Sequence, residues 1–201
     1  MQRFITNKPV EVREHDGVKT ISGYAAVFYR ADDPGTEFEL FDGFIERIAP
    51  GAFSDAMGRD DVRALFNHEP NLILGRNKAG TLRLSEDEVG LWYDIDLPDT
   101  QTGRDVAESI SRGDVTGSSF AFTITDQDRR TENGVDVREI RGVQLYDVGP
   151  VTYPAYESTS ISARSGEITE EVDALKAERE EREKQSREVM CRLRLIELGL
   201  T

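Results

Sequence analysis

The sequence predicts an α+β fold: a mostly antiparallel, barrel-like β-sheet flanked by short helices, followed by a charged C-terminal helix. Three observations support this prediction. Short segments alternate apolar and polar residues with a period of two, and turn residues separate them. Residues 167–198 contain no Gly or Pro and are rich in helix-forming residues. With 201 residues, the chain has room for one domain, which we place at residues 1–164, and a helical tail at residues 165–201.

Strands are predicted throughout the first 164 residues. Residues 81–85 alternate Leu with polar residues, and residues 91–97 return after a turn at 86–90. A turn at 130–134 similarly precedes a return strand. A further apolar run leads to His68. That run is also interpreted as a strand, and the other predicted strands are 21–28, 81–85, 91–97, 120–124, 135–140 and 143–148.

Two short helices interrupt the strands. One follows Pro50 and Gly51 and extends through Met57. The other covers residues 104–112, where Val106 and Ile110 share a face and Gly113 ends the helix. We expect both helices to lie against the sheet.

The tail has apolar residues at helical spacing near its two ends, but Arg179, Arg182 and Ser186 occupy the same positions in its middle. A broken apolar face is compatible with a solvated helix. It is also compatible with a partner-binding or coiled-coil segment.

Composition excludes several kinds of function. The net charge of −14 argues against nucleic-acid binding, which needs a basic surface. Residues 165–201 contribute only −3 of that charge and residues 1–164 contribute −11, so the acidity belongs to the domain. One Cys excludes a disulfide framework and two His exclude a three-His zinc site. The sequence shows neither a signal peptide nor a membrane span, so we expect an intracellular protein with no membrane partner.

Few residues can form a nucleophile and its base. Ser118 and Ser119 follow Gly117 at the start of a predicted strand. A serine needs a base near neutral pH, usually His. His15 lies at a charged hairpin tip, which leaves His68 as the base for either serine. The alternative interpretation is an ordinary turn beside a histidine with a structural role.

A carboxylate would orient the imidazole of His68. Asp147 lies within an apolar strand, where a lone buried charge would be costly. Asp147 could instead face water, and Glu69 and Asp114 are rival candidates.

Several stretches, in order, resemble the prohead proteases of tailed phages, which are capsid-maturation serine proteases distantly related to herpesvirus assemblin. The resemblance covers roughly residues 20–164. The matching stretches are 21–28, 48–53, 65–68, 74–76, 80–84, 90–91, 112–122 and 148–156.

This resemblance implies a herpesvirus-protease-like fold and a serine endopeptidase without metal or cofactor. It places the base on His68, the nucleophile on Ser119 and the third member on Asp147. We expect main-chain N–H groups near residues 117–119 or a neighbouring loop to hold the oxyanion, with Arg76 or Arg141 assisting.

The resemblance further implies cleavage of scaffold, or of the scaffolding segment of the major capsid protein, inside the prohead in the host cytoplasm. Self-cleavage and self-association are also expected. The tail would dock on scaffold or capsid protein, or be removed by self-cleavage. The alternatives are a catalytically inactive assembly protein of the same fold and an unrelated acidic interaction module.

Overall fold

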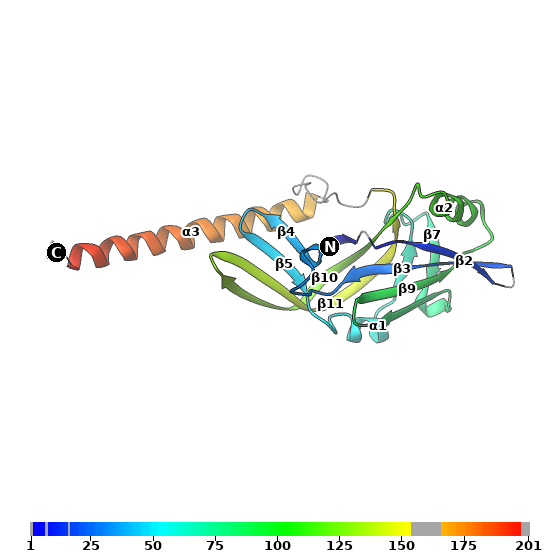
Figure 1. The fold of residues 1–201 in the computed structure, drawn as a ribbon, viewed down its shortest axis with the longest axis horizontal. Helices are drawn as coiled ribbons and strands as arrows, with labels where there is room; N and C mark the ends of the chain where they lie inside the picture. Colours follow the sequence, from blue (N-terminus) through cyan, green and yellow to red (C-terminus); the bar gives the residue numbers. More distant parts are fainter. Residues whose placement is uncertain (1, 7, 16, 154–165, 198–201) are drawn as a thin grey trace. The chain divides into compact units, whose positions relative to one another are not determined.

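The computed structural model describes residues 2–6, 8–15, 17–153 and 166–197. The chain divides into two compact units, Met1–Ala163 and Arg164–Thr201. Within these described ranges, the first unit contains the strands and two α-helices, and the second contains one long helix (Figure 1). Among the described residues, no helix is long and apolar enough to span a membrane.

The larger sheet is built around two long strands. The path runs through β1 (Gln2–Thr6), β10 (Gly117–Glu132), β11 (Val135–Val151), β5 (Phe44–Ile48) and β4 (Glu37–Phe41). Two further strands, β6 (Arg63–Leu65) and β7 (Ile73–Arg76), join the same sheet through β11.

Strand β11 organises this sheet. It pairs antiparallel with β10 along one edge. Along its other edge it pairs in parallel first with β5, at residues 136–140, and then with β6, at Asp147 and Val148. Asp147 therefore lies beside Arg63, the first residue of β6. The chain leaves β6 after Leu65 and enters the loop that carries His68.

The smaller sheet has the order β2 (Glu11–His15), β3 (Val18–Val27), β9 (Gly90–Asp96) and β8 (Leu82–Glu86). Leu91, Tyr93 and Ile95 of β9 have no exposed surface, while the residues between them are half-buried. This is the period-two pattern of a strand with one buried face. The core lies between the two sheets, where β3 packs on β10 and β1.

The prediction of a barrel-like sheet was wrong. In the part of the chain that the structure describes, the strands form two open sheets. The larger sheet runs from β1 to β4, and the smaller sheet runs from β2 to β8. A barrel needs its first and last strands to pair. Here the buried faces of two sheets cover each other instead. The segments predicted at 135–140 and 143–148 are one continuous strand, β11, and the strand predicted at 120–124 extends over the whole of β10.

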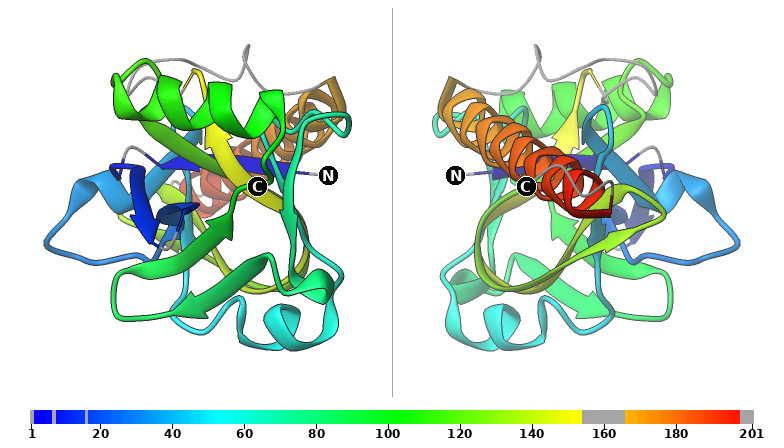
Figure 2. Two further views of the ribbon diagram at one scale, coloured as in Figure 1. Left: turned by 90° about the vertical axis from the view of Figure 1, so that its right-hand side faces the viewer. Right: turned by 90° about the vertical axis from the view of Figure 1, so that its left-hand side faces the viewer.

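The two helices of the first unit lie on opposite sides of it (Figures 1 and 2). Helix α1 (Ser54–Arg59) packs against β11 and β8, and α2 (Gln101–Ser111) against β2. Helix α2 begins before the predicted residue 104 because Thr100 caps it, accepting a hydrogen bond from the Gly103 N–H at 3.2 Å. Short 3₁₀ turns, η1 (Pro34–Thr36) and η2 (Asn77–Ala79), complete the unit.

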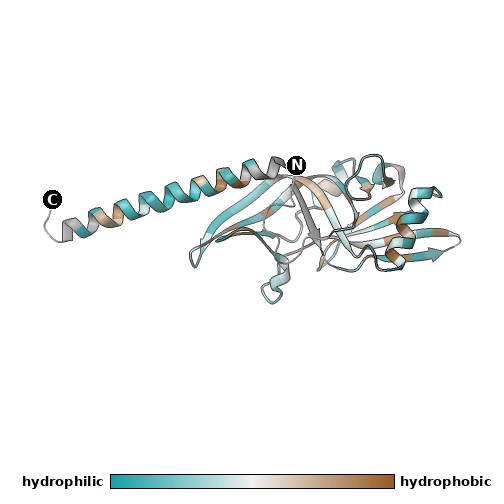
Figure 3. Cartoon of the chain, turned by 90° about the horizontal axis from the view of Figure 1, so that it is seen from above, coloured by the Kyte–Doolittle hydropathy of each residue, from teal (hydrophilic) through white to brown (hydrophobic). Residues whose placement is uncertain are grey.

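The second unit contains α3 (Gly166–Glu197). Figure 3 shows it mainly in the colour of hydrophilic residues. Arg179 pairs with Glu183 one turn further along, at 3.0 Å, and Gln185 donates to Glu181 at 3.1 Å. Such side-chain pairs, four residues apart on the helix surface, stabilise a helix without contacts to other elements.

Candidate active site

Three of the residues singled out in the sequence form a hydrogen-bonded chain in the first unit. His68 Nε2 lies 2.6 Å from Ser119 Oγ, and His68 Nδ1 lies 2.5 Å from Asp147 Oδ1. With Nδ1 protonated and donating to the carboxylate, Nε2 is free to accept the serine proton. The three residues come from β10, β11 and the loop between β6 and β7.

The two candidate serines point to opposite faces of β10, as adjacent strand residues do. Ser118 faces the smaller sheet, where its Oγ lies 2.6 Å from the hydroxyl of Tyr93. Ser119 faces the other side, toward His68. Burial raises the pKa of the Tyr93 phenol, so this group is neutral and hydrogen-bonds Ser118 as a hydroxyl. Of the two serines, the structure brings Ser119 to the histidine.

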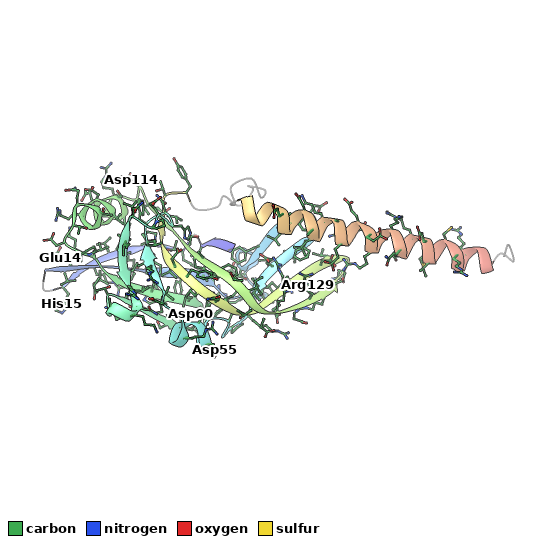
Figure 4. All side chains as sticks on the ribbon, turned by 180° about the vertical axis from the view of Figure 1, so that it is seen from behind. Glu14, His15, Asp55, Asp60, Asp114 and Arg129 are labelled. Carbon is green, nitrogen blue, oxygen red and sulfur yellow. The ribbon has the colours of Figure 1, made fainter. Side chains whose placement is uncertain are left out.

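A tight loop presents His68. It starts after β6 and ends at β7, and three main-chain hydrogen bonds fold it: Phe66 N–H to Leu72 O, Glu69 N–H to Phe66 O, and Leu72 N–H to Glu69 O. A loop closed this tightly holds the imidazole near the end of β11. The other histidine, His15, lies at the exposed end of the β2–β3 hairpin (Figure 4).

Of the three candidate orienting acids, Asp147 is the one that contacts His68. Glu69 is exposed and accepts hydrogen bonds from the main chain and side chain of Asn71. Asp114 follows α2 at the outer margin of the unit, where it pairs with Arg112 at 3.2 Å (Figure 4).

A glycine lets the histidine loop approach the strand that carries Asp147. Gly149 lies directly opposite Ser119 in the register of β10 and β11. A Cβ at Gly149 would lie 2.1 Å from the carbonyl oxygen of Leu65, the last residue of β6. Only glycine permits this contact. Neither Gly149 nor Tyr93 was identified from the sequence. The glycine between Val148 and Pro150 was the available signal, because a strand glycine often marks a close backbone approach.

The site is almost closed to solvent. Ser119 has no exposed surface, and the side chains of His68 and Asp147 are each 8% exposed. Hydrogen bonds are stronger at such low exposure than in water, and the imidazole offsets the cost of burying the Asp147 carboxylate.

The two arginines expected to assist the oxyanion are engaged elsewhere. Arg76 binds Asp61 through two hydrogen bonds, of 2.7 and 2.6 Å, and this guanidinium lowers the pKa of Asp61 to about 2. Arg141 pairs with Asp128 and Glu139. Residues 117–119 lie in β10 rather than in a loop: all three pair with β11, and Ser118 and Ser119 also pair with β1.

A serine hydroxyl bonded to a histidine, whose other nitrogen bonds a buried carboxylate, is the arrangement that serine hydrolases use for acyl transfer. The comparison with protein families agrees with this class. The chain belongs to the caudovirus prohead serine proteases, because the model of that family matches residues 8–174. It is thus a member of a family of serine proteases of bacteriophage capsid maturation. No curated protein and no solved structure matches the chain.

Proposed function

We propose that this chain is an active serine endopeptidase that cleaves the scaffold protein, or the scaffolding segment of the major capsid protein, inside the prohead, and that also cleaves itself. The observation that carries the proposal is the chain of two hydrogen bonds from Ser119 through His68 to Asp147. Membership of the prohead serine protease family supports the capsid substrates and a site of action within the prohead in the host cytoplasm.

In the proposed mechanism, His68 Nε2 takes the proton from Ser119 as Oγ attacks the scissile carbonyl carbon. The tetrahedral intermediate collapses when His68 gives that proton to the leaving amine. Water then hydrolyses the acyl-enzyme by the same proton transfers through His68. Asp147 holds Nδ1–H and stabilises the imidazolium that forms in each half-reaction. The residues need neither a metal nor a cofactor for these steps.

A distant relation to herpesvirus assemblin belongs to the same proposal. In it, Asp147 takes the place of the second histidine that those enzymes use. Self-association also belongs to the proposal, as does docking of residues 165–201 on scaffold or capsid protein, with removal of this tail by self-cleavage as the alternative.

The test is co-expression of this chain with the major capsid protein of the same phage, followed by mass spectrometry of the new termini. The native chain should generate a defined new N-terminus on the capsid or scaffold protein and a shortened form of itself. Ser119→Ala should leave both proteins intact, because no nucleophile remains. Ser118→Ala is the matched control and should retain cleavage, because its hydroxyl faces Tyr93.

Cleavage that persists in Ser119→Ala would exclude the proposed nucleophile. A native chain that assembles with capsid protein and cleaves nothing would favour the inactive assembly protein.

A further inference from the structure

The base of the candidate site is held in an unusual backbone conformation. Asn67 and His68 have φ angles of +54° and +56°, so two consecutive non-glycine residues lie in the left-handed region. Asn and His are found there more often than most residues, but each such residue costs free energy that surrounding contacts must offset. Without those contacts, the loop would relax and His68 would move.

Besides the hydrogen bonds within the loop, Asn67 supplies contacts to the segment at the end of β11. Its main-chain N–H donates to Pro150 O at 3.1 Å. Its side-chain Nδ2 donates to Thr152 Oγ1 at 2.9 Å, and its Oδ1 accepts from the Thr152 N–H at 2.8 Å. Three hydrogen bonds thus fasten the residue before His68 to the end of β11.

The same strand carries Asp147, three residues before Pro150. The Asn67 contacts therefore fix the loop of the base to the strand of the orienting carboxylate. The position of His68 relative to Asp147 and Ser119 follows from this attachment, because β11 also pairs with β10 beside Ser119.

We infer that Asn67 is a positioning residue that, with Thr152 as its partner, holds His68 in the left-handed conformation in which it reaches both Ser119 and Asp147. This inference rests on the proposed function. A displacement of about 1 Å at a reacting group can reduce the rate about 100-fold, so loss of the attachment should act on the chemical step.

The first test is Asn67→Gly in the full chain, assayed on a peptide that spans the cleavage site mapped in the co-expression experiment. Glycine keeps the left-handed conformation accessible and removes only the two side-chain hydrogen bonds. We expect kcat to fall about 10-fold or more and KM to change by less than about twofold, because a displaced base slows proton transfer while the substrate contacts stay.

Asn71→Gly is the matched control. Asn71 lies in the same loop and is exposed, and its side chain donates to Glu69 of that loop. It should leave kcat and KM within about twofold of the native values. A serine-directed fluorophosphonate gives a second readout: its rate of reaction with Ser119 should fall in Asn67→Gly and not in Asn71→Gly.

The partner residue gives an independent pair of variants. Thr152→Val removes the acceptor hydroxyl and keeps the main-chain N–H, and it should lower kcat several-fold. Thr152→Ser restores the hydroxyl and should restore most of kcat. Thermal unfolding of each variant distinguishes loss of the fold from displacement of His68. We expect kcat to fall in variants that still unfold cooperatively.

Unchanged kcat in both Asn67→Gly and Thr152→Val would overturn the inference, as would equal losses in Thr152→Val and Thr152→Ser. Failure of the proposed function looks different: the native chain itself would then show no hydrolysis that depends on Ser119.

Discussion

At the residue scale, the distinction between two neighbouring serines depends on which face of β10 each occupies. Ser119 meets the histidine, whereas Ser118 and Tyr93 form a fully buried hydroxyl pair that ties β10 to the smaller sheet. The buried pair anchors the strand one residue before the proposed nucleophile. We therefore expect this pair to hold β10 against the smaller sheet.

This role predicts a non-additive pair of substitutions. Ser118→Ala and Tyr93→Phe should each cost about 1–3 kcal/mol of unfolding free energy, because each leaves a buried hydroxyl without its partner. The double variant should cost clearly less than the sum, since it leaves no orphaned group. Urea unfolding at neutral pH gives the unfolding free energies of the native chain, the two single variants and the double variant. Additive costs would show that the two hydroxyls do not depend on each other.

At the scale of elements, the site is assembled where β6 joins β11. The parallel pairing at Asp147 and Val148 sets the start of the histidine loop, and Gly149 lets the carbonyl of Leu65 come within contact of the strand. Two residues after Leu65, Asn67 forms the hydrogen bonds that attach this loop to Pro150 and Thr152. One short strand and one glycine thus bring the loop of His68 to the strand that carries Asp147.

Gly149→Ala should therefore damage catalysis as well as stability. The added Cβ would lie 2.1 Å from Leu65 O, which forces β6 and the loop after it away from β11. We expect a loss of about 100-fold in kcat/KM, measured on the mapped peptide.

Gly134→Ala is the matched control for this substitution. Gly134 lies at the turn between β10 and β11 with a φ of +83° and no atom within 4 Å of an added Cβ. Alanine there should cost about 1 kcal/mol of stability from backbone strain and leave kcat/KM nearly unchanged. If both variants lost activity in proportion to stability, Gly149 would have only a structural role.

At the scale of the whole molecule, the chain combines an acidic first unit, which contains both sheets and the three site residues, with the long charged helix α3. The hydrogen bonds that define the site join residues of the first unit only. Peptide cleavage and incorporation into the prohead can therefore be tested separately.

Deletion of residues 165–201 makes that test. The shortened chain should still cleave the mapped peptide in a reaction that Ser119→Ala abolishes, because its three site residues are retained. It should be incorporated poorly into proheads if the tail docks on scaffold or capsid protein, which quantitative mass spectrometry of purified proheads would measure. Unchanged incorporation would argue against docking by the tail.

The sequence by itself limited the chemistry to very few residues. With two histidines, one of them in a charged hairpin, any Ser–His pair had to use His68. The strands at 81–85 and 91–97 were also predictable, because alternation and turn residues are local properties.

Only the tertiary structure decided the rest, because strand pairing joins residues far apart in the chain. The alternation of β10 assigns Ser118 and Ser119 to opposite faces, but only the packing of the smaller sheet shows which face is turned toward Tyr93. Likewise, which of Asp147, Glu69 and Asp114 contacts His68 depends on the pairing of β6 with β11, a contact between segments about 80 residues apart that no local pattern specifies. The same limit applies to the open sheets, which the sequence predicted as a barrel. Closure of a barrel depends on whether its two edge strands pair, and that pairing is also a contact between distant segments.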